Sequence, residues 1–75
     1  MEELVKLIAR GLVEYPEAVT VRVVELEQVT LYEVSVAPSD IGKIVGKSGR
    51  IIKAFRSVVS AAAVAYGKRI SIEIV

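Results

Sequence analysis

A pair of glycines in the middle of the chain restricts its fold more than any other feature. Gly46 and Gly49 enclose Lys47-Ser48, with the apolar pair Ile44-Val45 before them and Ile51-Ile52 after them. Glycine lacks a β-carbon, so its backbone can take angles closed to other residues and can lie against another backbone. The stretch 41–52 therefore predicts a tight link between two short amphipathic segments. Free N–H groups in such a link, beside the start of a following helix, suit an anion such as phosphate.

The basic residues of the chain gather around this link. The formal net charge is only +1, but residues 41–72 carry seven positive charges and no negative one, while the rest carries three positive and nine negative charges. The seven cations are Lys43, Lys47, Arg50, Lys53, Arg56, Lys68 and Arg69. This separation favours a polyanionic ligand, the alternative being a solvated basic helix face. Both interpretations stay open for Lys43 and Arg56.

The first half of the chain predicts one helix and two strands. Residues 2–13 have a helical apolar stripe, made by Leu4, Val5, Leu7, Ile8 and Leu12. Tyr15-Pro16 should end the helix, because the residue before proline is pushed out of the α region. Residues 19–24 and 29–36 alternate apolar and polar side chains, as strands with one buried face do. We place the reversal between these strands at residues 25–28, so they should form an antiparallel hairpin.

The second half predicts two helices and a final strand. Ser39 is an expected N-cap for a short helix over residues 40–45. Residues 50–66 predict a long helix whose core side holds Ile51, Ile52, Phe55, Val58, Val59, Ala62 and Tyr66. Gly67 is the expected left-handed stop, and residues 70–74 alternate as a strand. The last strand should lie parallel to the second across the crossover. We therefore predict a single α+β domain, residues 1–75, in which a three-stranded mixed sheet has three helices on one face.

The glycine link, with its flanking aliphatic residues and the basic residue after the second glycine, resembles the signature of the KH domain. That domain binds single-stranded nucleic acid with a helix, a GxxG loop and a second helix. The element order resembles the type II version of the fold. Further segments resemble the small bacterial KhpA family, namely Glu14-Tyr15-Pro16-Glu17, Val36-Ala37-Pro38, Ser60-Ala61-Ala62-Ala63 and Tyr66-Gly67-Lys68-Arg69. The resemblance implies binding of single-stranded RNA, with single-stranded DNA as an alternative. It also implies an RNA chaperone or post-transcriptional regulator in cell-envelope control or translation.

The predicted mechanism follows from the residues of the link. Backbone N–H groups near Lys47 and Ser48 should approach the phosphates, while neighbouring cations supply charge without reading sequence. Ile44, Val45 and Ile52 should form the apolar floor of a groove for the bases, with edge hydrogen bonds from nearby backbone or from Arg69. For Ile51, core packing is the favoured role. Since Phe55 and Tyr66 are expected on the core side, stacking should contribute little. The predicted RNA-binding residues are Lys43, Ile44, Val45, Gly46, Lys47, Ser48, Gly49, Arg50, Ile52, Lys53, Lys68 and Arg69.

Binding by one such domain should be weak. Three or four phosphate contacts on a single strand predict a slope of log K against log salt of roughly −2 to −3. A second subunit would raise avidity, and the resemblance implies a homodimer or pairing with a KhpB (Jag) type protein. A strip of small residues on the long helix is the predicted dimer face, the alternative being an ordinary lightly covered helix face. The strip consists of Ala54, Ser57, Ala61, Val64 and Ala65.

Other classes of function are less well supported. The chain has no cysteine and no histidine, so we expect no disulfide, metal or cofactor and no Cys- or His-based catalysis. Residues 42–48 evoke a Walker A loop, but that motif needs four residues between its glycines, and here there are three. Asp40 with Glu33 or Glu73 could serve acid-base chemistry, yet nothing in the sequence brings them together. With no apolar run of about 20 residues and no signal peptide, a cytosolic protein is expected. The main alternative is a protein-interaction adaptor that has the KH shape.

Overall fold

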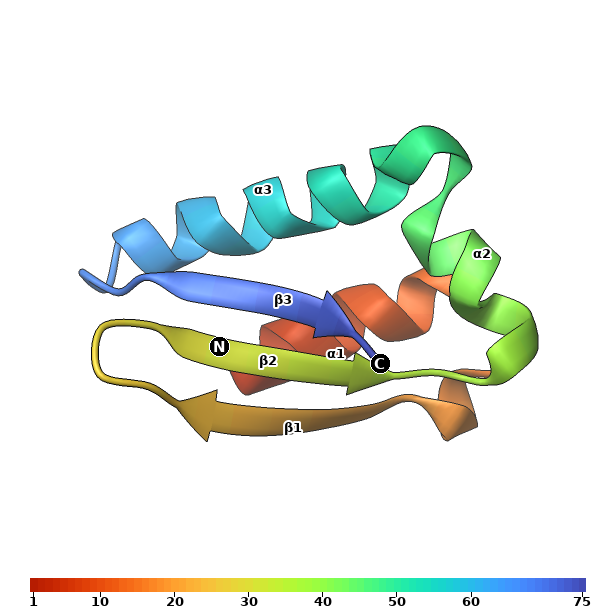
Figure 1. Ribbon diagram of the computed structural model, residues 1–75, viewed down its shortest axis with the longest axis horizontal. Coiled ribbons are helices and arrows are strands. Elements are labelled where there is room, and N and C mark those ends of the chain that lie inside the picture. Colours follow the sequence, from red (N-terminus) through yellow and green to blue (C-terminus); the bar gives the residue numbers. More distant parts are fainter.

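Three strands form one mixed sheet in the computed structural model, which describes all residues 1–75 (Figure 1). The strands are β1 (Thr20–Glu25), β2 (Thr30–Ser35) and β3 (Ile70–Ile74), in the spatial order β1-β2-β3. β1 pairs antiparallel with β2, and β2 pairs parallel with β3. The topology predicted from the alternating segments is confirmed, including the crossover that carries the glycine link.

Three helices cover one face of this sheet (Figure 1). They are α1 (Glu2–Leu12), α2 (Ile41–Val45) and α3 (Arg50–Val64). Short 3₁₀ turns lie before β1, before α2 and between α2 and α3, at Pro16–Ala18, Pro38–Asp40 and Lys47–Gly49. The element order of the prediction is therefore confirmed, and the predicted boundaries differ by only a few residues.

The core lies between the helices and the inner face of the sheet. Tyr32 and Val34 of the central strand β2 and Ile72 of β3 are buried, and Tyr32 and Ile72, as register partners, lie on the same face of the sheet. The helices contribute the remaining buried side chains of the cluster, mainly Val5, Ala9, Ile44, Ile52, Phe55 and Val59. The outer face is polar and carries an ion pair between Arg22 and Glu33 at 3.3 Å. The alternation in the strands thus separates a core face from a solvent face.

The predicted apolar stripes are wider than the core that the fold builds. Leu7, Val58 and Tyr66 are 70%, 54% and 73% exposed, so their predicted burial was wrong, and Ile51 is 36% exposed. Ala9 and Ala63 are fully buried instead. Three strands offer little inner surface to the helices, so only a narrow line of α1 and α3 contacts the sheet. Small side chains fill the positions of closest approach.

Two of the predicted helix boundary signals, Gly67 and Ser39, had different outcomes. Gly67 has a φ of +68°, and its N–H bonds to the carbonyl of Val64 at 2.9 Å, so the predicted left-handed stop is confirmed. Ser39 was wrong as an N-cap, because it lies within the 3₁₀ turn Pro38–Asp40, and no side chain caps α2. Asp40 occupies the N-cap position but directs its carboxylate elsewhere.

Candidate nucleic-acid interface

The glycine link forms a compact turn with two unpaired N–H groups. Gly46 (φ 77°, ψ 171°) and Gly49 (φ 73°, ψ 18°) take positive φ angles, as does Ser48 (φ 56°, ψ 26°). The Gly46 N–H bonds to the Gly42 carbonyl at 2.8 Å, and the Gly49 N–H bonds to the Gly46 carbonyl at 3.1 Å. The N–H groups of Lys47 and Ser48 make no backbone hydrogen bond, and both residues are exposed. These two donors are available to an anion.

The two glycines are required for different reasons. A β-carbon on Gly46 would lie 2.6 Å from Cγ1, 2.9 Å from Cβ and 2.9 Å from the backbone nitrogen of Ile51. A β-carbon on Gly49 would meet only Cγ2 of Ile52, at 3.8 Å. Gly46 therefore lets the link close against the first turn of α3, whereas Gly49 supplies a left-handed angle on the open side of the turn.

Most cations around the link are unpaired. Of the seven basic residues between 41 and 72, only Lys43 forms an ion pair. Its Nζ lies 2.6 Å from Oε2 of Glu14 and 3.9 Å from Oδ1 of Asp40, and the hydrogen bond to Glu14 is the main reason why the pKa of Lys43 is raised. The free cations nearest to the link in sequence are Lys47, Arg50 and Lys53. We place the positive charge available to a ligand on these three.

A buried carboxylate fixes α2 to the end of α1. Asp40 is fully buried, and its two oxygens accept hydrogen bonds from the N–H groups of Glu14 at 3.1 Å and Tyr15 at 3.0 Å. The side chain thus joins segments about 25 residues apart in the sequence. The family resemblance at residues 14–17 does not indicate this contact. A carboxylate before a helix, such as that of Asp40, ordinarily suggests a local N-cap.

The free edge of β3 faces α3 and has a hollow at its first residue. β3 is an edge strand, and Arg56 of α3 donates from Nε to the carbonyl of Ile72 at 3.2 Å. Farther along, Ser60, Val64 and Ile70 line a hollow of about 200 Å³ together with Val29, Lys68 and Arg69. The backbones of Arg69 and Val75 form hydrogen bonds with β2, so the backbone groups of these odd-numbered residues face the sheet. By the alternation of a parallel ladder, Ile70, Ile72 and Ile74 direct their N–H and C=O groups to the free edge.

The predicted apolar floor is mostly inside the core. Ile44 is fully buried and Ile52 is 6% exposed, while Val45 is partly exposed. Ile51, for which core packing was favoured, borders a separate hollow between α1 and α3. Side-chain contact with a ligand near the link is therefore open chiefly to Val45, and Ile44 and Ile52 lie beneath it as support.

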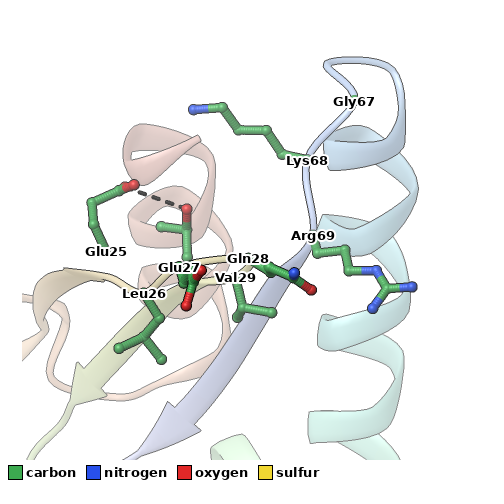
Figure 2. Close-up of a pocket in the computed structure, with 9 residues that line it drawn as sticks. Glu25, Leu26, Glu27, Gln28, Val29, Gly67, Lys68 and Arg69 are labelled. Atoms are coloured by element: carbon green, nitrogen blue, oxygen red, sulfur yellow. Dashed lines mark hydrogen bonds between the residues drawn. The ribbon is translucent and has the colours of Figure 1, made fainter.

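Lys68 and Arg69 lie between α3 and β3, at the opposite end of α3 from the glycine link. Figure 1 shows these two ends of α3. The 15 residues of α3 span about 22 Å at the helical rise. Figure 2 shows the two side chains pointing to opposite sides, beside a polar hollow of about 180 Å³ lined by the β1–β2 turn. The structure thus brings Lys43, the link, Arg50 and Lys53 together at one end, and Lys68 and Arg69 at the other.

The predicted dimer face is accessible. All five of its residues are exposed: Ala54, Ser57, Ala61 and Val64 on α3, and Ala65 at the C-cap position that follows it. Beside them, an apolar hollow of about 350 Å³ lies between the two long helices, lined by Ile8, Leu12, Arg50, Ile51, Ala54, Phe55 and Val58. Exposed apolar surface therefore continues from the strip toward α1.

The carboxylates considered for catalysis are separated. Glu33 and Glu73 are register partners on the outer sheet face, whereas Asp40 is enclosed by backbone N–H groups. No group of three or more metal-ligating side chains is present. No helix has the length and apolar character that crossing a membrane would require.

Comparisons with known proteins agree with this geometry. A family model described as the KH domain of KhpA/KhpB matches residues 2–74. The RNA-binding protein KhpA of Clostridium perfringens is 48% identical over 75 residues, which is 100% of both chains. The protein of the same name from Oceanobacillus iheyensis is 42% identical over 74 residues, or 99% of each chain. Era from Aquifex aeolicus superposes with a TM-score of 0.74 at 21% identity, covering 96% of this chain and 28% of Era, which supports the fold alone. The chain belongs to the KhpA/KhpB family of KH domains.

Proposed function

We propose that this protein binds single-stranded RNA, with its phosphates held at the glycine link. The observation that carries the proposal is the pair of unpaired N–H groups of Lys47 and Ser48, surrounded by cations that have no carboxylate partner. N–H groups in such a turn bind anions, and an approaching backbone meets no β-carbon at Gly49, on the open side of the turn. The printed names of the relatives, RNA-binding protein KhpA, support the same ligand.

The bases are proposed to lie along the free edge of β3. The outward N–H and C=O groups of Ile70 and Ile74 can bond to base edges, and single-stranded bases expose those edges. Arg56, which spans from α3 to the Ile72 carbonyl, borders this path. Because phosphate contacts carry no sequence information, the edge contacts supply whatever base preference exists.

The proposed assembly is a homodimer or a pair with a KhpB-type protein, through the strip on α3. Its small side chains permit close helix approach, and the neighbouring apolar hollow would be covered by a partner. A dimer presents two weak sites, so that avidity compensates for few phosphate contacts. An RNA chaperone or post-transcriptional regulator in the cytoplasm fits such a binder. An adaptor that uses only this strip is the second candidate, and the exposed apolar surface favours it.

The decisive experiment reverses the charge of the link. The double variant Lys47→Asp with Ser48→Asp should abolish binding of a fluorescent oligouridylate at low salt, measured by anisotropy, while circular dichroism and sedimentation stay those of the parent. A matched control, Arg10→Glu with Gln28→Glu, changes the net charge equally at exposed positions away from the link. It should retain most of the affinity.

Two outcomes would contradict the proposal. If both double variants bound RNA as well as the parent, the link would not hold the phosphates. If the parent itself bound no oligonucleotide while sedimenting as a dimer, the adaptor would be the better account.

A further inference from the structure

Tyr66 stands at the surface rather than in the core. It follows the last turn of α3 and is 73% exposed. Together with Met1, Tyr32 and Lys68 it lines a hollow of about 320 Å³. Tyr32 is only 5% exposed, so it supplies the floor, and Tyr66 forms an open aromatic wall. An exposed aromatic ring beside such a hollow needs an explanation that core packing does not give.

We propose that Tyr66 is a stacking platform for a nucleobase of the bound strand, beyond the proposed path of the bases along β3. This inference rests on the proposed RNA binding and adds to it a subsite at the far end of α3. It also reverses the expectation, drawn from the sequence, that stacking contributes little. Base stacking on an aromatic ring is tolerant of sequence, since every base has a flat face.

The position of Lys68 connects the two regions. Lys68 lines both the hollow at the first residue of β3 and the hollow beside Tyr66. It points away from Arg69, which remains on the α3 side (Figure 2). Lys68 has no carboxylate partner. A nucleic-acid strand that passes from the free edge of β3 beyond Arg69 therefore meets a free ammonium group before it reaches the Tyr66 ring.

The lining of the hollow is aromatic at its floor and wall. Tyr32 and Tyr66 both line it, together with Lys68, and no carboxylate is among the lining residues. A base can therefore stack on the Tyr66 ring while its phosphate remains with the ammonium group of Lys68.

The test uses strand length and abasic sites. The link is expected to take about four nucleotides, so an oligouridylate of about eight can reach Tyr66 and a tetramer cannot. Tyr66→Leu should weaken binding of the octamer about fivefold or more and leave the tetramer unchanged. Tyr66→Phe keeps the ring and should bind as the parent does. Removing single bases along the octamer should weaken the parent at one terminal position, and that effect should vanish in Tyr66→Leu.

The results distinguish a stacking subsite at Tyr66 from the other possible roles of this residue. If Tyr66→Leu bound the octamer as tightly as the parent, while the Lys47→Asp, Ser48→Asp variant lost it, the stacking subsite would be refuted and the proposed RNA binding would stand. If Tyr66→Leu altered sedimentation and not RNA affinity, the hollow would belong to a protein contact, and the proposal would again be overturned. Loss of octamer and tetramer binding alike would also contradict it.

Discussion

The turn geometry predicts that three nearby glycines respond differently to alanine. Gly46→Ala places a side chain in a backbone region that is open essentially to glycine only, at a cost of about 1–3 kcal/mol. It also forces a carbon to within 2.9 Å of the backbone nitrogen of Ile51, an overlap that only movement of α3 could relieve. Overpacking of this kind adds about 1–3 kcal/mol. The expected loss is about 2–6 kcal/mol, from a total of about 4–11 kcal/mol for 75 residues.

The other two substitutions serve as controls. Gly49→Ala keeps a left-handed angle but meets no overlap, so its cost of about 1–2 kcal/mol is partly offset by the lower entropy of the unfolded chain. Gly42→Ala lies in α2 with open space around it and should stabilise by up to about 1 kcal/mol, because alanine favours helix. Urea unfolding followed by circular dichroism measures all three free energies. If Gly46→Ala lost no more than Gly49→Ala, the reasoning from the close contact with Ile51 would be refuted.

Three further predictions concern neighbouring residues. Lys53→Gln should reduce the slope of log K against log salt by about 0.7. Lys43→Gln should leave the slope unchanged, because Glu14 holds that ammonium group. Equal effects of the two variants in anisotropy titrations would contradict this difference. Asp40→Ala should lower the free energy of unfolding in urea by about 3 kcal/mol, because two backbone N–H groups lose a charged partner, and Asp40→Asn by about half as much. A loss under about 1 kcal/mol for Asp40→Ala would refute the role of this carboxylate in fixing α2 to the end of α1. Ala61→Glu should convert the proposed dimer to a folded monomer in sedimentation experiments, and unchanged association would remove α3 from the interface.

The sequence was sufficient for the order of elements. Each segment shows the period of its structure, and the turn residues lie between the segments, so local preference and burial agree. Gly46 and Gly49 could be identified as the glycines of a tight link because two glycines at that spacing, enclosed by aliphatic pairs on both sides, are an uncommon combination. Gly67 was equally clear, since a left-handed residue after an apolar helix is ordinarily glycine.

The candidate site was only partly predictable. The cations could be listed, but their partners could not, because Lys43 meets Glu14 across 29 residues of sequence. Arg56 was left open for the same reason, since its acceptor is a carbonyl of β3. Ser39 looked like a cap because local rules favour it, while the tertiary fold placed Asp40 at the N-cap and used its carboxylate on the end of α1.

By itself, the sequence determined which segments are helix and strand, where the chain turns sharply, and that its positive charge is concentrated in one half. These properties depend on near neighbours along the chain. Only the tertiary structure decided which apolar residues are enclosed and which charges are free, because a three-stranded sheet is too narrow to cover the full apolar width of α3. Phe55 therefore lies in the core while Tyr66, on the same predicted stripe, faces solvent.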